Sequence, residues 1–313
     1  MSNLPLVSII TPSYNQGQFI EETILSVKHQ TYPKIEHIIV DGGSVDNTLD
    51  ILHKYEGTYN MRWLSEPDEG MYYAINKGFG MARGEILAYL NSDDMYLPWA
   101  VEVAVATFSK TDEAGIIFGD LIVVNVADGW IRLWFYQDFD YNFYARTGFI
   151  GQPSVFIRRN VWETIGPFDT AFRLLADCEY WLRAATNGIK LVHCNEFLAV
   201  DRLHPHAKRV RRHLEFSSEE ERIRKRYCEM MRVKQDMLLK LNDALKNALF
   251  RRYQMLLFVL NIKLGLKPKR GQRLASWSGC HLYWANMLQN MVPFLSPKVE
   301  VRLLGWPARV VPV

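Results

Sequence analysis

Short hydrophobic runs alternate with amphipathic segments along the first hundred residues of the chain. Leu6–Thr11 and Ile35–Val40 are continuous apolar runs rich in β-branched residues, which is typical of strands buried on both faces of a sheet. Between them, residues 19–27 repeat apolar side chains at helical spacing. The β-α-β-α order predicts an α/β protein with a mostly parallel sheet and helices on both faces. Further strands are predicted at 61–64 and 85–90, and further helices at 47–55 and 71–82.

The pattern becomes less regular after Pro98 and changes character after His204. Ser218-Glu219-Glu220-Glu221 fits a capping box, so we expect a helix to begin there. Apolar residues then recur at helical spacing as far as Leu249, opposite a face rich in Lys and Arg. Between residues 98 and 204 we expect helices at 98–109 and 175–186 and strands at 115–124, 153–157 and 189–192.

Composition fits a globular protein with a sizeable core, because 49% of the 313 residues are hydrophobic and 23% are charged. No run of roughly 20 apolar residues is present, so we expect no membrane-spanning helix. The first residues have no signal-peptide pattern, so we expect no cleaved leader. The four cysteines lack C-x-x-C spacing and predict neither a zinc site nor a disulfide framework; a reducing cytoplasm is the simplest setting.

Charge is distributed unevenly along the chain. Residues 201–273 carry 20 Lys and Arg against 8 Asp and Glu, which leaves 17 basic and 26 acidic residues elsewhere. A basic segment joined to an acidic part favours an anionic partner for that segment, either a membrane surface or a nucleic acid.

Polar clusters follow four of the predicted strands, where each strand ends. In parallel sheets, ligands bind at the carboxyl ends of the strands. We therefore expect a ligand site at this edge. The clusters are residues 11–15, 41–44, 66–69 and 91–94.

Asp93 and Asp94 follow a buried apolar strand, where acidic side chains are costly unless something uses them. Carboxylate oxygens suit Mg²⁺ or Mn²⁺ held jointly with phosphate oxygens, and such a metal would neutralise a departing diphosphate. The alternative is that this pair caps the next helix.

Three further carboxylates have both a functional and a structural interpretation. Asp41 could bond a nucleotide base or ribose, or it could form the turn before Gly42-Gly43. Asp177 and Glu179 begin a predicted helix. If one of them lies in a cleft, its carboxylate could act as a general base on an acceptor hydroxyl. Their alternative role is to complement the dipole of that helix.

Basic side chains give weaker signals. His204 could complete a metal site or contact phosphate, although a single histidine is more often a surface or capping residue. Lys77 and Arg83 could contact phosphates, although helical Lys and Arg are usually solvated.

In order and spacing, these segments together resemble the catalytic domain of glycosyltransferase family 2, which has the GT-A fold. The resemblance covers about Leu6 to His206, roughly two thirds of the chain. The matching segments are VSIITPSYN at 7–15, IIVDGGS at 38–44, DNT at 46–48, NKG at 76–78, ARGE at 82–85, LNSDD at 90–94 and GPFD at 166–169.

The resemblance implies a donor site for a nucleotide-diphosphate sugar, with UDP favoured over guanine or thymine nucleotides. Pro12, Tyr14 and Asp41 would line the base and ribose pocket. Asp93 would bind Mn²⁺ or Mg²⁺, with Asp94 beside it.

It also implies an inverting reaction, because Asp177 would occupy the position of the catalytic base that deprotonates the acceptor hydroxyl. His204 falls where the family often has a late histidine near the metal or the diphosphate.

Three positions depart from the family's pattern. Asn91 stands where the D-x-D motif begins, and Tyr73 stands where related members often have Asp. Ala176 replaces the Glu of a frequent Glu-Asp pair, which leaves Glu179 as an alternative base.

The implied organisation is a GT-A catalytic domain over residues 1–204, with a nucleotide-binding half (1–95) and an acceptor-binding half (96–204). Residues 205–313 form a mainly helical, basic C-terminal extension. We expect this region to lie on the inner face of a membrane, so that a cytoplasmic enzyme becomes peripheral there and takes a saccharide or lipid-linked saccharide as acceptor. The alternative is packing on the catalytic domain or on another subunit of a homo-oligomer; no nucleic-acid partner is expected.

Two other classes remain as alternatives. A nucleotidyltransferase uses a similar sheet and metal. It would need a glycine-rich phosphate-binding loop near the start of the chain, and residues 12–17 do not form such a loop. A non-catalytic binding or scaffold protein on a transferase fold is compatible with Asn91 and Ala176, although Asp93 and Asp177 argue against it. An oxidoreductase is disfavoured because no G-x-G-x-x-G follows the first strand.

Overall fold

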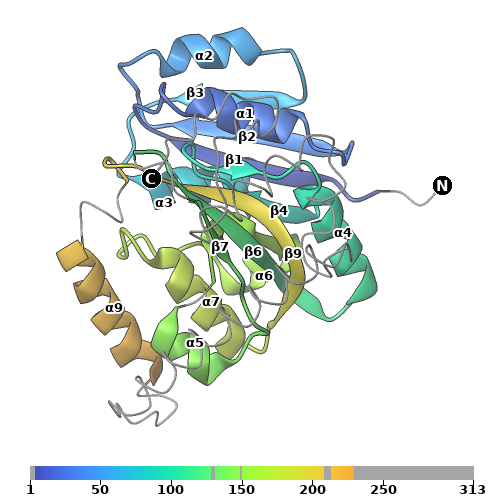
Figure 1. Cartoon of the computed structure of the whole chain (residues 1–313), viewed down its shortest axis with the longest axis vertical. Helices are drawn as coiled ribbons and strands as arrows, with labels where there is room; N and C mark the ends of the chain where they lie inside the picture. Colours follow the sequence, from blue (N-terminus) through green and yellow to red (C-terminus); the bar gives the residue numbers. More distant parts are fainter. Residues whose placement is uncertain (1–3, 128–130, 149, 208–212, 229–313) are drawn as a thin grey trace, which may run out of the picture.

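The computed structural model describes residues 4–127, 131–148, 150–207 and 213–228. The strands of these residues form one sheet in the order β3-β2-β1-β4-β8-β6-β9-β5, and β7 pairs with β6 at one side. Helices pack on both faces of this curled sheet, as the alternating sequence pattern predicted (Figure 1).

The amino-terminal half of the sheet is parallel. Its strands are β1 (Val7–Ser13), β2 (Ile35–Asp41), β3 (Met61–Ser65) and β4 (Ile86–Tyr89). The register aligns Ser13 with Asp41 and Asp41 with Ser65, so these strands end at a common edge.

Alternate side chains of β2 explain how helices cover both faces of this half. Ile39 packs in one apolar cluster with residues of α1 (Ile20–Lys28) and α2 (Thr48–Tyr55). Ile38 and Val40 point the opposite way, into the larger core shared with α3 (Met71–Met81). Successive side chains of a strand face opposite sides, so a strand that is apolar throughout must be covered twice.

The second half of the sheet mixes strand directions. Strand β8 (Val155–Arg158) runs antiparallel to β4 and to β6 (Ala114–Asn125), and β6 runs parallel to β9 (Lys190–Leu203). The short strand predicted at 189–192 is wrong in length, because β9 continues for 14 residues and reaches the edge where the parallel strands end. Two short strands, β5 (Met95–Tyr96) and β7 (Ile131–Trp134), complete the sheet.

The remaining helices surround this second half. The predicted helices at 98–109 and 175–186 are found as α4 (Ala100–Lys110) and α7 (Ala176–Thr186). The structure adds the elements α5 (Tyr141–Thr147), η1 (Gln152–Ser154) and α6 (Arg159–Ile165).

The expected capping box is wrong. Helix α9 spans His213–Cys228, so Ser218 lies inside it and Glu219 turns its side chain toward the catalytic domain. Figure 1 shows α9 beside α5 and α7. The basic cluster at 208–212 and the predicted helix beyond Cys228 lie outside the described residues. Within the described ranges, no helix is long and apolar enough to cross a membrane.

Helix α3 depends on a glycine where it crosses β1. A Cβ at Gly78 would lie 2.5 Å from Ile10 Cγ2, whereas a Cβ at Gly80 in the same helix would meet nothing within 4 Å. We expect Gly78→Ala to destabilise the fold by about 1–3 kcal/mol through overpacking. The control Gly80→Ala should stabilise it by about 0.5–1 kcal/mol, because alanine has the better helix propensity. Urea unfolding of both variants measures this, and equal effects would show that α3 does not pack closely on β1.

Candidate active site

A cleft of about 1130 Å³ opens where the parallel strands end. Its walls come from both halves of the sheet and from α3, α7 and α9. Segments far apart in sequence therefore meet here, as expected for the carboxyl edge of an α/β sheet.

The β1 side of the cleft contains Pro12 and Tyr14. Pro12 is buried, whereas the Tyr14 side chain is 60% exposed. The following loop is tied to the segment after β2, because Asn15 N donates to Ser44 Oγ (2.7 Å) and Gly17 N donates to an Asp46 carboxylate oxygen (2.9 Å). This leaves an open aromatic ring above a fixed loop.

Asp41 has the structural role that the sequence left as an alternative. Its buried carboxylate accepts hydrogen bonds from the backbone N–H groups of Gly43 and Ser44 and from the hydroxyls of Ser44 and Ser65. Gly42, the next residue, lines the cleft. Asp41 therefore fixes the turn that borders the site.

The predicted metal residues Asp93 and His204 lie together although 111 positions separate them. His204 Nε2 is 3.0 Å from Asp93 Oδ2, and the imidazole ring lies 4.5 Å from the ring of Phe19. Neither Asp93 nor Asp94 caps the next helix, because the residue before α4, Trp99, has no side-chain cap.

Asp94 is buried and accepts a hydrogen bond from the backbone N–H of Arg202 (3.1 Å). Burial raises the pKa of Asp94 well above its usual range, and the neighbouring carboxylates of Asp93 and Asp201 raise it further. This part of the cleft is thus an anionic pocket.

The donor set here fits a hard divalent cation that shares its ligands with phosphate. Asp93 offers carboxylate oxygen, His204 offers imidazole nitrogen, and Asn91 Oδ1 is buried without a hydrogen-bond partner among the described residues. Among all the residues that the structure describes, no group of three or more His, Cys, Asp or Glu side chains is arranged to hold a metal. Sites with one or two protein carboxylates, completed by substrate phosphates, are usual for Mg²⁺.

Asp177 lines the opposite wall of the cleft, in the first turn of α7. Its carboxylate accepts hydrogen bonds from the Tyr72 hydroxyl (3.2 Å) and from the Cys178 backbone N–H (2.8 Å). Burial raises the pKa of Asp177 to about 6, while these hydrogen bonds lower it. A carboxylate with that pKa can remove a proton near neutral pH.

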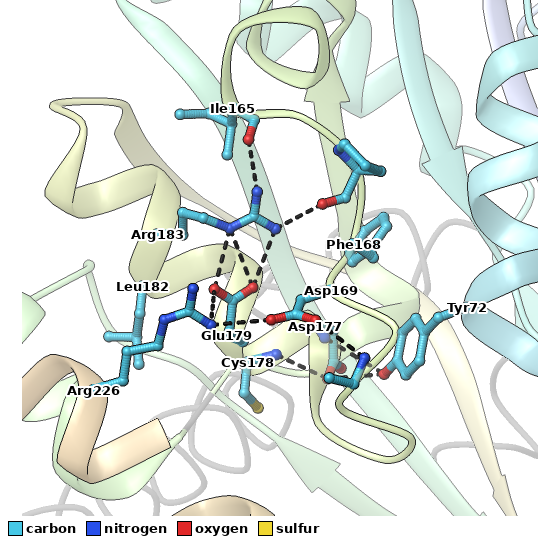
Figure 2. A network of polar contacts seen from close by, with 12 residues as sticks. Tyr72, Ile165, Phe168, Asp169, Asp177, Cys178, Glu179, Leu182, Arg183 and Arg226 are labelled. Atoms are coloured by element: carbon cyan, nitrogen blue, oxygen red, sulfur yellow. Dashed lines mark hydrogen bonds and ion pairs between the residues drawn. The ribbon is translucent and has the colours of Figure 1, made fainter. Parts of the chain in front are cut away.

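Glu179, the other candidate base, is not among the residues that line the cleft, and Figure 2 shows it bound to Arg183 and Arg226 instead. It is fully buried and accepts hydrogen bonds from the guanidinium of Arg183 and from the hydroxyl of Tyr227. Positions two apart in a helix point to different sides, so only Asp177 meets the cleft. Glu179 is part of the packing between α7 and α9.

The two predicted phosphate-binding cations lie in other places. Lys77 forms an ion pair with Glu66, and both side chains are exposed. Arg83 pairs with the buried Glu36, which also binds Ser8 near the amino ends of the strands. Arg83 is therefore at the edge of the sheet opposite the cleft.

Sequence reasoning missed two residues that organise the site. Arg202 is buried and binds Glu22, the Asp93 carbonyl and the Phe19 carbonyl, so it ties the Asp93 turn to α1. The sequence signal for Arg202 was its position two residues before His204 at the end of a strand, where residues two apart point to the same face. Tyr72 was hidden because an aromatic residue in a helix is usually core.

Comparisons with known proteins identify the class. Residues 8–164 match the family Glycosyl transferase family 2, and this is half of the chain. A PGL/p-HBAD biosynthesis glycosyltransferase of Mycobacterium tuberculosis is 31% identical over 186 residues, which are 58% of this chain and 71% of that protein. Glycosyltransferase AglE of Haloferax volcanii is 30% identical over 215 residues, 63% of this chain and 67% of that protein. The chain belongs to glycosyl transferase family 2.

Solved structures show the same fold. S. aureus TarS 1–349 in complex with UDP superposes with a TM-score of 0.55 at 19% identity, covering 91% of this chain and 79% of that one. The complex of the same protein with UDP-GlcNAc gives 0.54 at 17% identity, with 93% and 82% covered. The described structure is thus the GT-A fold that the sequence predicted.

The raised pKa of Asp177 makes stability depend on pH. Its folded-state pKa of about 6 exceeds the value of about 3.9 for an unfolded chain. Ionisation therefore opposes folding, and the stability that the protonated form provides is lost as pH rises from about 4 to about 6. Above pH 6 we expect Asp177→Asn to raise the unfolding free energy by about 3 kcal/mol, and with it the melting temperature; the gain should shrink toward pH 4.5.

Thermal unfolding between pH 4.5 and 8 measures this difference. Asp112→Asn, at an exposed position, controls for the loss of one negative charge. A gain that is the same at every pH would mean that the Asp177 carboxyl titrates as it does in water.

Proposed function

We propose that this protein is an inverting, metal-dependent glycosyltransferase. It moves a sugar from a nucleotide-diphosphate donor to a hydroxyl of a saccharide or lipid-linked saccharide. The observation that carries the proposal is that Asp177, with a pKa of about 6, shares one cleft with Asp93, which in turn contacts His204. A base and a place for a leaving diphosphate are what this reaction requires.

The donor base and ribose would bind at the β1 side of the cleft. Pro12 and the open ring of Tyr14 offer a surface for a nucleotide base, and Asp41 holds the Gly42-Gly43 turn beside them. We propose UDP as the nucleotide, and the TarS complexes with UDP and UDP-GlcNAc support this choice by analogy of fold.

Asp93 and His204 would hold the divalent cation, Mn²⁺ or Mg²⁺, with the buried Asp94 beside them. When bound, that cation would neutralise the charge that grows on the leaving diphosphate. Arg202 keeps these residues in place from the protein side, because it binds the carbonyl of Asp93 and donates its own N–H to Asp94.

Asp177 would take the proton of the acceptor hydroxyl as its oxygen attacks the anomeric carbon. A new bond forms between these two atoms while the bond from the anomeric carbon to the diphosphate oxygen breaks, and attack from the opposite face inverts the centre. Tyr72 orients the carboxylate by donating to one of its oxygens, which leaves the other for the proton.

The acceptor would lie along the part of the cleft formed by the second half of the sheet and α9. Trp134, Tyr136 and Phe216 line that part and offer aromatic surface to a sugar ring or an apolar aglycone.

We also propose that the enzyme works at the cytoplasmic face of a membrane, through the basic segment around Lys208, Arg209, Arg211 and Arg212. Each basic residue near anionic lipid contributes about 1 kcal/mol, so four together would hold a peripheral enzyme. Association into a homo-oligomer through the C-terminal region stays an alternative use of the same segment.

Nucleotide binding can be tested by thermal shift with UDP, UDP-glucose, UDP-GlcNAc, GDP-mannose and dTDP-glucose, each with and without Mn²⁺. A ligand at a hundred times its Kd stabilises the folded state by about 2.7 kcal/mol. We expect one nucleotide family to raise the melting temperature only with Mn²⁺, and Asp93→Ala to abolish the effect. Asp112→Ala is the control. No shift with any nucleotide, from folded protein, would favour a non-catalytic role, and release of pyrophosphate during turnover would point to a nucleotidyltransferase.

The two candidate bases can be separated by activity. Asp177→Asn should lower kcat by about 10²–10⁴-fold while nucleotide binding persists, because only proton removal is lost. Glu179→Gln should mainly reduce stability, since its carboxylate is buried in the contact with Arg183 and Tyr227. In the wild type, kcat/KM should rise tenfold per pH unit below about 6 and then level off. Full activity of Asp177→Asn would exclude it as the base.

A further inference from the structure

Helix α7, which carries Asp177, is capped by a residue from another helix. Its N-cap residue Leu175 makes no side-chain cap. Instead, the buried carboxylate of Glu219 in α9 accepts hydrogen bonds from three consecutive backbone N–H groups: Arg173 (2.7 Å), Leu174 (2.9 Å) and Leu175 (2.9 Å). Glu219 lies 44 residues beyond Leu175 and outside the segment that matches the family.

The loop held by Glu219 reaches the base directly. Leu174 and Leu175 line the cleft, and Asp177 follows two residues later. The hydroxyl of Tyr72, which binds Asp177, also lies 3.3 Å from the carbonyl oxygen of Leu174. One face of this loop therefore contacts Glu219 while its other groups surround the base.

A second set of contacts fixes the same helix to α9. Figure 2 shows Arg226 reaching from α9 to Asp169 and to Glu179, at 3.0 Å and 3.7 Å. The Tyr227 hydroxyl donates to Glu179 as well. Helix α9 thus contacts α7 at Glu179, two residues from Asp177.

We infer that Glu219 is a positioning residue for the base, so that the C-terminal extension completes the active site. This rests on the proposed function of Asp177. The first N–H groups of a helix stabilise a nearby carboxylate, both by hydrogen bonds and through the helix dipole. Glu219 binds the three N–H groups that precede α7 and brings its negative charge to the start of that helix, and a like charge nearby favours the protonated form of the Asp177 carboxyl.

The other groups around Asp177 are consistent with this arrangement. They are Tyr72 of α3, Tyr89 of β4, Tyr144 of α5 and Cys178 of α7, and Glu220 of α9 lies near Cys178 in turn. Burial raises the pKa of each of these tyrosines and of the Cys178 thiol, so they are neutral near pH 7. Glu220 forms an ion pair with Arg224.

The test compares Glu219→Gln with Glu221→Gln, the same change at an exposed position of the same helix that pairs only with Lys225 among the described residues. The probe is the nucleotide sugar of the panel above that the wild type consumes. We expect Glu219→Gln to lower kcat by about 10–100-fold, the scale for a misplaced catalytic group, with nucleotide Kd within about twofold. The acid limb of its pH profile should move to lower pH, and Glu221→Gln should match the wild type in all three measurements.

A second variant at position 219 keeps the carboxylate charge but shortens the side chain. Glu219→Asp is one methylene shorter, so we expect kcat to fall while the acid limb moves less than in Glu219→Gln. If folded Glu219→Gln keeps the wild-type kcat and acid limb, the inference is wrong. It is also wrong if kcat and nucleotide binding fall together in proportion to the folded fraction, because Glu219 would then have a structural role alone.

A measurement without turnover separates this inference from the proposed function. The gain in melting temperature from Asp177→Asn between pH 4.5 and 8 reports the titration of Asp177 in the free protein. In the Glu219→Gln background, we expect this gain to be smaller and to level off at a lower pH, because its onset is set by the unfolded-state pKa of Asp177 and its end by the folded-state pKa. If that shift occurs while the wild type transfers no sugar, the proposed function fails and the positioning by Glu219 stands. If the gain is unchanged, the positioning is contradicted whatever the activity.

Discussion

The arrangement of the site depends on one buried cation, Arg202. Its guanidinium lies between the two halves of the sheet, pairs with Glu22 of α1, and binds the carbonyls of Phe19 and Asp93. The guanidinium also lies over the ring of Phe19, and the backbone N–H of Arg202 donates to Asp94. A buried charge must be fully paired, so removal of any one partner would leave another unsatisfied. This makes the Asp93 turn, α1 and the end of β9 a single unit, and it brings His204 against Asp93.

The second wall of the cleft follows a different principle. The position of Asp177 is set by the start of α7. The backbone there donates hydrogen bonds to Glu219 of α9, because the N-cap residue of α7 itself makes no side-chain cap. The side of α7 away from the cleft carries the charged network of Glu179, Arg183 and Arg226, whereas the side toward the cleft carries Asp177 among neutral tyrosines. The same helix therefore separates a fully paired carboxylate from one whose pKa is raised.

Local pattern was sufficient for the parallel half of the molecule. Continuous β-branched runs and helical spacing predicted β1 to β4 and α1 to α3 within a few residues, because each of these elements is stabilised by a core that the alternation itself encodes. It failed where the stabilising partner lies far away. The extension of β9 beyond residue 192 is stabilised by pairing with β6 and β5, and α9 begins before Ser218 although its polar pattern suggested a cap there.

By itself, the sequence determined the fold class, the edge of the sheet that bears the site, and the chemical types of its residues. Asp93 could be named without coordinates because an acidic side chain after a buried strand is informative, and Asp177 because it begins a predicted helix at the position that the family resemblance gives to a base. Only the tertiary structure separated Asp177, which lines the cleft, from Glu179, which is paired with Arg183, since both begin the same helix and only their neighbours differ. The structure also showed that the Asp41 carboxylate binds groups of its own turn and that Arg83 lies at the edge of the sheet opposite the cleft. Three residues that contact the site were identified only there: Arg202, Tyr72 and Glu219. These assignments depend on which distant groups satisfy each hydrogen bond and charge, and that is fixed by packing across the sheet rather than by spacing along the chain.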